Sequence, residues 1–314
     1  MKKILVTGGL GFIGSHTAER LSSLGHEVIG LDNFSPYYSL ELKKLNEQAL
    51  RNKGISVIKK DLRDADFSKD LPKDVDYIFH FAAQPGISKT STFEDYFSNN
   101  IIGTKNLIDY ALSLNDLKLF INIGTSSIYG LEATYPESIP PKPASHYGVT
   151  KLAAEQLALQ KSREKLFKAC SLRLYSVIGP RERPEKMYTK LIACAFSDDA
   201  FPLYEGSATH LRSFTYVGDI VDGVVSVINN EEKVDGEIIN LGTEVEHTTQ
   251  EGIEAVESVI GKSIKINHVE ARAGDQLRTK ADIDKAKALL NYNPKTTLLD
   301  GVKAQVDWYK ANFL

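Results

Sequence analysis

The chain of 314 residues is poor in cysteine: it has only Cys170 and Cys194, which form no closely spaced motif and lie among apolar neighbours. This pattern argues against a disulfide framework or a zinc site and favours buried structural thiols. Long apolar runs are missing too, and none approaches the roughly 18 residues of a membrane span. With a net charge of only −3, nothing favours a nucleic acid or an anionic membrane as a partner.

The N-terminal stretch MKKILVTGG is similar to a signal peptide only at first sight. Its two lysines precede an apolar stretch of three residues that ends before Thr7, far short of the apolar core of a signal peptide. We therefore expect a cytoplasmic protein. No group of histidine, cysteine and carboxylate residues has the spacing of metal ligands, so we expect no metal.

The first half of the chain alternates short apolar runs with helical patterns. Nearly continuous apolar strands that are separated by helices predict a parallel sheet covered on both faces. With right-handed crossovers, the expected fold class is α/β, a doubly wound parallel sheet of the Rossmann type. The predicted strands lie at 3–8, 27–32, 55–62, 75–83, 117–125 and 169–179, and the helices at 13–25, 99–114 and 147–165.

After Gly179-Pro180 the sequence becomes richer in proline, charge and aromatic residues. Further helices are predicted at 219–230, 281–294 and 298–313, and a strand at 237–242. These patterns predict a smaller, interleaved C-terminal lobe. We expect residues 1–175 with about 213–245 to form a dinucleotide-binding domain, and about 176–212 with 246–314 to form the substrate-binding lobe.

A glycine-rich string joins the first predicted strand to the first helix. Gly8, Gly11 and Gly14 give the pattern G-x-x-G-x-x-G in the context that a dinucleotide-binding turn requires. Without Cβ atoms the backbone can approach a pyrophosphate, which the helix N-terminus attracts. Asp32 ends the second strand, where a carboxylate accepts the ribose hydroxyls and repels a 2′-phosphate, so NAD is expected rather than NADP. Asp61 either flanks the adenine or caps a turn.

Tyr147 and Lys151 lie one helical turn apart, so they share a face. A free tyrosine has a pKa of about 10, and lowering it to about 7 requires roughly 4 kcal/mol of preference for the phenolate. A nearby ammonium and a positive nicotinamide in a desolvated cleft are suitable sources of that preference. Thr125 ends a strand at the carboxyl edge of the sheet, where such folds bind ligands. The alternative for the pair is an ordinary surface helix pair.

Several motifs together carry a family resemblance over essentially the whole chain. The sequence resembles the extended short-chain dehydrogenases/reductases, specifically the nucleotide-sugar epimerases and dehydratases. The motifs that carry this resemblance are TGGLGFIG, DNF, DL at 61, HFAAQ, NNIIGTKNL, GTSSIYG, YGVTK, RSFTYVGDI and GDQLRTKAD.

The resemblance implies an enzyme with bound NAD, in which Tyr147 is the base, Lys151 also holds the nicotinamide ribose, and Thr125 hydrogen-bonds the reacting sugar hydroxyl. It also implies a homodimer formed through the helices at 99–114 and 147–160. Ser88 or Lys89 is expected on the sugar and nicotinamide side. The cofactor-binding residues that it implies are Gly8, Gly11, Phe12, Ile13, Gly14, Asp32, Asn33, Asp61, Leu62, Ala82, Ala83, Gln84, Asn100, Tyr147 and Lys151.

The two residues after Thr125 favour one reaction of this family. Dehydratases of this type carry Asp-Glu there, and decarboxylases usually carry Glu at the second position, because these reactions need a general acid and base. This chain has Ser126 and Ser127, so epimerisation at C4 through a transient 4-keto sugar is expected.

The substrate expected from the resemblance is UDP-glucuronate, with UDP-galacturonate as the product. Thr125, Ser126, Ser127 and Ser176 could surround its carboxylate with hydroxyl donors. Either Arg181 or Arg183 could add positive charge there, the alternative for each being a contact with phosphate or solvent. For the diphosphate, the resemblance implies Arg212 and Arg278, which make good bidentate ligands. UDP-glucose or UDP-N-acetylglucosamine remains an alternative substrate, and a non-catalytic NAD-binding sensor or scaffold is a distant one.

Two histidines are not expected to act in catalysis. His80 lies within a predicted strand, where a core histidine with satisfied hydrogen bonds is favoured over a ligand. His146 precedes Tyr147 and is expected only to position the turn.

Overall fold

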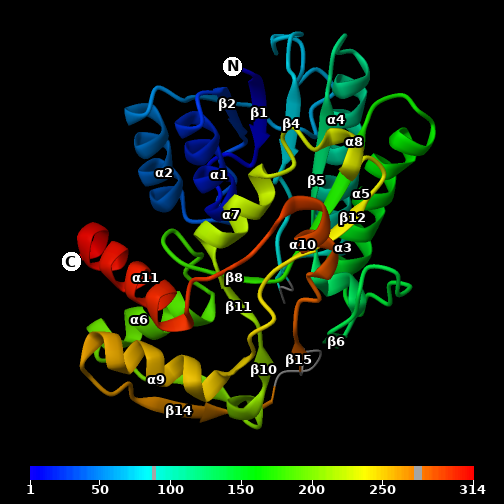
Figure 1. Cartoon of the computed structure of the whole chain (residues 1–314). Coiled ribbons are helices and arrows are strands. Elements are labelled where there is room, and N and C mark those ends of the chain that lie inside the picture. Colours follow the sequence, from blue (N-terminus) through cyan, green and yellow to red (C-terminus); the bar gives the residue numbers. More distant parts are fainter. Residues whose placement is uncertain (87–89, 272–277) are drawn as a thin grey trace.

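The computed structural model describes residues 1–86, 90–271 and 278–314, and its centre is a seven-stranded sheet (Figure 1). All of the neighbouring pairs in this sheet are parallel. The strand order reverses between β4 and β1, and open α/β sheets bind ligands at such a switch point. Across the sheet the order is β12 (Ile238–Leu241), β7 (Ala169–Leu174), β5 (Leu119–Thr125), β4 (Tyr77–His80), β1 (Lys3–Thr7), β2 (Glu27–Asp32) and β3 (Ser56–Lys59).

Helices cover both faces of this sheet, which confirms the predicted doubly wound fold (Figure 1). One face packs against α1 (Phe12–Ser23), α2 (Leu40–Asn52) and α7 (Val217–Val225). The other packs against α4 (Gly103–Leu112) and α5 (His146–Arg163), preceded by the short helix α3 (Phe93–Tyr96) and the π-helix η1 (Phe97–Ile102). The short helices α8 (Glu231–Val234) and α10 (Asp284–Leu290) complete this part.

The C-terminal elements have a separate apolar core below the carboxyl edge of the sheet (Figure 1). Its helices are α6 (Met187–Ser197), α9 (Thr249–Ile260) and α11 (Leu298–Phe313), and the 3₁₀ turn η3 (Ser207–Thr209) contacts α9. The 3₁₀ turn η2 (Ser126–Tyr129) instead follows β5 and packs with the core of the central sheet. Three small sheets join in: β9 (Phe201–Tyr204) with β14 (Ile266–Val269), β8 (Ser176–Ile178) with β11 (Phe214–Tyr216), and β13 (His247–Thr248), β10 (Leu211–Arg212), β15 (Arg278–Thr279) and β6 (Glu132–Ala133) in that order. In the described ranges, no helix is long and apolar enough to cross a membrane.

The predicted strand at 169–179 is wrong as a single element. The chain leaves the central sheet at Tyr175, so β7 pairs with β5 and β12 while β8 pairs with β11. The apolar run is continuous, but each half finds a different partner strand from a distant part of the sequence. Strand ends are decided by such tertiary pairing more than by local preference.

Candidate active site

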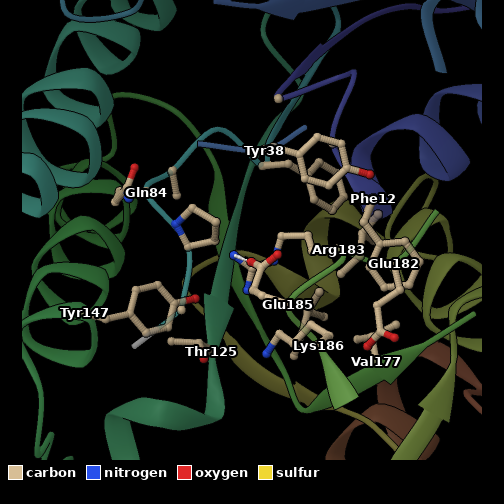
Figure 2. Close-up of a pocket in the computed structure, with 18 of the residues that line it drawn as sticks. Phe12, Tyr38, Gln84, Thr125, Tyr147, Val177, Glu182, Arg183, Glu185 and Lys186 are labelled. Atoms are coloured by element: carbon tan, nitrogen blue, oxygen red, sulfur yellow. Dashed lines mark ion pairs between the residues drawn. The ribbon is translucent and has the colours of Figure 1, made fainter. Parts of the chain in front are cut away.

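A cavity of about 850 Å³ lies at the carboxyl ends of the parallel strands and extends among the C-terminal elements. Figure 2 shows Gln84, Thr125 and Tyr147 on one side of it, with Arg183 and Glu185 in its middle. Residues far apart in the sequence therefore meet here because the strand ends of a parallel sheet share one edge.

The glycine turn lets the chain pass very close to itself below this cavity. Gly8 has a φ of +66°, and a Cβ atom on Gly14 would lie 2.3 Å from the carbonyl oxygen of Gly8. Helix α1 begins directly after Gly11, which has no side chain to cap it. The first amides of the helix therefore lack a side-chain cap, and their dipoles favour an anion. This cradle fits a dinucleotide pyrophosphate.

Asp32, at the end of β2, is buried and already accepts three hydrogen bonds. They come from the amides of Leu10 (3.2 Å) and Phe34 (2.9 Å) and from the ammonium of Lys43 (2.6 Å). A carboxylate has about four acceptor positions, so one remains for a ribose hydroxyl. The sequence analysis missed Lys43, which returns to Asp32 only because α2 folds back over the end of the strand.

Asp61 caps a turn, one of the two interpretations left open above, and its place beside the adenine stays a prediction. It lines the cavity, and its carboxylate also accepts from the amide of Arg63 within a turn (2.9 Å). The Arg63 guanidinium beside it lowers the pKa of Asp61 to about 2. Asn33 donates to the same carboxylate at 3.0 Å, so two of the expected cofactor residues are linked directly.

Thr125 ends β5 and caps the turn that follows. Its hydroxyl accepts from the amide of Ser127 and donates to the Ser127 hydroxyl, both at 3.2 Å. Ser126 and Ser127 line the cavity together with Thr125, and so does Ser176 at the start of β8. The hydroxyl cluster expected from the sequence is therefore present at one wall of the cavity.

Tyr147 and Lys151 lie at the N-terminal end of α5, which the Ser145 side chain caps by accepting from the amide of Gly148. Burial raises the pKa of Tyr147, while the Thr125 side chain and the charge of Arg183 act to lower it. The sequence analysis did not assign this role to Arg183, and the effect that it expected from Lys151 and a bound nicotinamide stays a prediction. Burial lowers the pKa of Lys151 to about 8, against the opposing charge of Glu155.

Asn100 and His80 lie behind the cavity wall. Asn100, inside the π-helix η1, accepts from the Gln84 amide (2.7 Å) and donates to the Thr150 hydroxyl (3.0 Å), so it holds Gln84 in place. His80 lies between the hydroxyls of Thr7 and Thr104, 2.8 Å from each. Burial lowers the pKa of His80 to about 3, which agrees with a neutral core histidine.

The segment between β8 and α6 distinguishes the two candidate arginines. Arg181 points to α1, where it binds Glu19 (2.8 Å) and the Ser15 hydroxyl (3.2 Å). Arg183 lines the cavity instead. Between them, Glu182 is buried in the C-terminal core, where it accepts from the hydroxyl of Thr189 and the side chain of Gln305. Burial raises the pKa of Glu182 to about 7.

Glu182→Gln should change how stability depends on pH. The carboxyl ionises near pH 4.5 when unfolded and near pH 7 when folded, so between these values the folded protein binds more protons. Its stabilising contribution is complete below pH 4.5 and is lost as the pH rises through 7. Urea unfolding should therefore show wild type losing about 2 to 3 kcal/mol relative to Glu182→Gln over this range.

The control for this measurement is the exposed Glu254, whose replacement by glutamine should leave the pH profile unchanged. Parallel profiles for wild type and Glu182→Gln would show that the buried carboxyl is not neutral in the folded protein.

The family model described as the NAD dependent epimerase/dehydratase family matches residues 4–242. The chain belongs to this family. Its cofactor is accordingly NAD, and the glycine cradle and Asp32 fit that group.

Members of the epimerase/dehydratase family are similar to this chain along its whole length. An uncharacterized UDP-glucose epimerase of Bacillus subtilis is 35% identical over 97% of this chain and 96% of the relative. UDP-glucuronate 4-epimerase 4 of Arabidopsis thaliana is 32% identical over 98% of this chain and 75% of the relative. The crystal structure of UDP-glucuronic acid 4-epimerase from Bacillus cereus, in complex with UDP-glucuronic acid and NAD, has a TM-score of 0.93 and 35% identity, covering 99% of this chain and all of that one.

Most of the site residues that the sequence analysis expected in this chain lie at the cavity, but not all of them. Asn100 lies behind the wall, and Arg278 is held by both carboxylate oxygens of Glu246, each 2.7 Å away. Ser88 and Lys89 are outside the described residues. The expected residues that line the cavity are Gly8, Gly11, Phe12, Ile13, Gly14, Asp32, Asn33, Asp61, Leu62, Ala82, Ala83, Gln84, Thr125, Ser126, Ser127, Tyr147, Lys151, Ser176, Arg183 and Arg212.

The sequence analysis also missed seven charged residues that line the cavity: Lys43, Lys60, Arg63, Lys190, Glu182, Glu185 and Lys186. The last three lie in the stretch PRERPEK, whose alternating charges gave no period from which to decide which side chains face inward.

Proposed function

We propose that the protein is an NAD-dependent nucleotide-sugar 4-epimerase that interconverts UDP-glucuronate and UDP-galacturonate. The observation that carries this proposal is the wall formed by Thr125, Ser126, Ser127 and Ser176, with Arg183 in the same cavity. The likeness to the Bacillus cereus enzyme over the full chain supports it.

In this proposal Tyr147 removes the proton from the 4-hydroxyl of the sugar and later returns it. When bound, NAD accepts the C4 hydride and returns it to the opposite face of the keto sugar. Thr125 holds the reacting hydroxyl, and Lys151 keeps positive charge near the phenolate and the nicotinamide ribose. Because burial alone raises the pKa of Tyr147, the phenolate depends on the positive charges around it.

The serines after Thr125 account for the choice of reaction. At positions 126 and 127 the chain offers hydroxyls and no carboxyl group, so these positions provide no acid or base for elimination. A 4-keto uronate loses CO₂ easily when its C5–C6 bond aligns with the carbonyl π system. Hydroxyl donors and a guanidinium that fix the carboxylate prevent that alignment.

The purified protein, incubated with UDP-glucuronate, should form UDP-galacturonate with no release of CO₂, as followed by NMR. No added nucleotide is needed if NAD stays bound, because the same hydride is returned in every turnover. Recovery of UDP-glucuronate alone would refute the uronate assignment.

UDP-glucose is the second candidate substrate, because the similar Bacillus subtilis protein is named a UDP-glucose epimerase. Parallel reactions with UDP-glucose, UDP-N-acetylglucosamine and UDP-glucuronate separate the candidates. A non-catalytic role is disfavoured because Thr125, Tyr147 and Lys151 all line the same cavity.

Residues 1–175 with about 213–245 are proposed to bind NAD, and about 176–212 with 246–314 the UDP-sugar. Arg212, which lines the cavity, is proposed to bind the diphosphate. The proposed role of Arg278 at the diphosphate requires release from Glu246. Substituting each arginine and measuring the affinity for UDP tests these roles.

A homodimer through α4 and α5 is also proposed. Phe93, Phe97 and Val149 are exposed large apolar residues beside this surface, and the ring of Phe93 lies 5.3 Å from that of His146. Analytical ultracentrifugation tests it. A cytoplasmic location is proposed from the two free cysteines, and cell fractionation tests that assignment.

A further inference from the structure

Arg183 already holds a carboxylate inside the cavity. Its Nη1 atom lies 2.9 Å from an oxygen of Glu185, and Figure 2 marks this ion pair with a dashed line. The two partners are in unequal surroundings, because the side chain of Arg183 is only 12% exposed whereas that of Glu185 is 53% exposed. The guanidinium is thus part of the cavity wall, and the carboxylate approaches it from the solvent side.

The contact between these two residues is one of charge rather than of a well-directed hydrogen bond. Among the described residues, the buried Nη1 atom has no hydrogen-bond acceptor of good geometry. An N–H group of Nη1 is therefore available to donate to a better-placed oxygen. Leaving a buried donor without an acceptor costs free energy.

The guanidinium also lies close to the backbone of Gly86. Its Nη2 atom lies where it would be 2.9 Å from a Cβ atom on Gly86, so the absence of a side chain at position 86 gives it room. Its charge reaches Tyr147 and acts to lower the pKa of that phenol. Arg183 is therefore close to the end of the cavity where the sugar would react.

We propose that Glu185 determines the preference between acidic and neutral sugars, because its carboxylate occupies Arg183 until the carboxylate of the substrate replaces it. This inference rests on the proposed function and goes further, since it assigns a specificity role to a residue that would not itself hold the product or the reacting atoms. A neutral hexose has no carboxylate to exchange, so its binding does not require Glu185 to leave.

The expected size of the effect follows from the exposure of Glu185. A partly exposed ion pair contributes little to stability, so removing the competitor should strengthen binding of the uronate by a factor of about 2 to 5. A sugar carboxylate inside the cavity can bind the guanidinium in the bidentate geometry that the resident carboxylate does not use.

The test compares Glu185→Gln with its parent by calorimetry. Both are prepared with NAD bound on a Tyr147→Phe background, so that binding is measured without turnover. The dissociation constant of UDP-glucuronate should fall by about 2 to 5-fold, while that of UDP-glucose should change by less than about 1.5-fold. With Arg183→Met added to both proteins, the uronate-specific gain should vanish, because the two residues act through one contact.

Three results would overturn the proposal. An equal gain for both sugars would mean that Glu185 acts on the diphosphate by long-range charge. Weaker uronate binding would mean that Glu185 positions Arg183, and unchanged binding would mean that the pair does not compete. Glu232→Gln, at an exposed ion pair with Lys168 that does not line the cavity, is the matched control and should change neither constant. The proposed function is judged separately, by conversion of UDP-glucuronate by the wild-type protein.

Discussion

Tyr147→Phe should lower kcat by about a thousandfold or more while leaving NAD bound, since losing a general base typically costs 10² to 10⁴ in rate. The change removes one oxygen, and the ring still fills the cavity between Tyr96 and the Thr125 turn. The remaining groups can bind and orient a sugar but cannot take its proton at the 4-hydroxyl. Turnover is measured by NMR, and bound NAD by chromatography of the nucleotide released on denaturation.

The neighbouring Tyr96 offers a matched control for this variant. Its ring centre lies 6.2 Å from that of Tyr147, and its hydroxyl donates to the carbonyl of Gly86 at 2.8 Å. Tyr96→Phe removes the same atom from a ring that is next to Tyr147 in space but has no part in the proposed chemistry. The variant should therefore keep kcat within about fivefold of wild type, the equivalent of one ordinary hydrogen bond. If Tyr147→Phe kept activity comparable to this control, the phenol would not be the base.

The parts of the site that local sequence could predict are those that need only a strand end and one helical turn. Thr125 is placed by the end of an apolar run, and Tyr147 and Lys151 by their spacing in a helix with a serine cap. Asp32 could be predicted for the same reason, because the carboxyl ends of the parallel strands all lie at the edge of the sheet where the cofactor binds.

The parts that could not be predicted depend on distant segments meeting. Lys43 reaches Asp32 only after α2 folds back, and the run at 169–179 divides because β8 finds β11 rather than the central sheet. Arg278 carries a family motif, yet its partner in the structure, Glu246, is a residue 32 positions away that the motif does not contain. Charge pairing of this kind has no period in the sequence and is decided by tertiary packing.

A buried charge network lies beneath the proposed catalytic residues. Glu155 follows Lys151 by one turn of α5, and Arg173 in β7 binds both of its carboxylate oxygens at 2.7 and 2.9 Å. Both side chains are only 1% exposed. The guanidinium also donates to the hydroxyl of Tyr129 (2.8 Å), and Ser171 donates to Glu155 (2.9 Å). The network thereby ties the helix that carries Tyr147 and Lys151 to the central sheet.

Glu155→Ala should reduce the free energy of unfolding by about 3 to 5 kcal/mol, because it leaves the guanidinium of Arg173 buried without its counter-ion. Removing the carboxylate also leaves the Ser171 hydroxyl without its acceptor, although it still accepts from Asn122 (3.0 Å). The loss should appear in urea unfolding of the NAD-loaded protein and as a lower melting temperature. A change of less than about 1 kcal/mol would mean that water or another group takes over the role of the carboxylate.

Replacing both Glu155 and Arg173 distinguishes what the ion pair contributes to the free energy of unfolding from the cost of leaving one charge buried alone. In Glu155→Leu combined with Arg173→Met, no charge is left behind, and apolar replacements of similar volume are often neutral for a buried pair. The double variant should therefore be more stable than Glu155→Ala by several kcal/mol. Its kcat then reports on the position of α5 and on the charge of Lys151, whose pKa Glu155 acts to raise. If Lys151 needs the network for either, kcat should stay low although stability has returned. Full recovery of both quantities would restrict the network to a structural role.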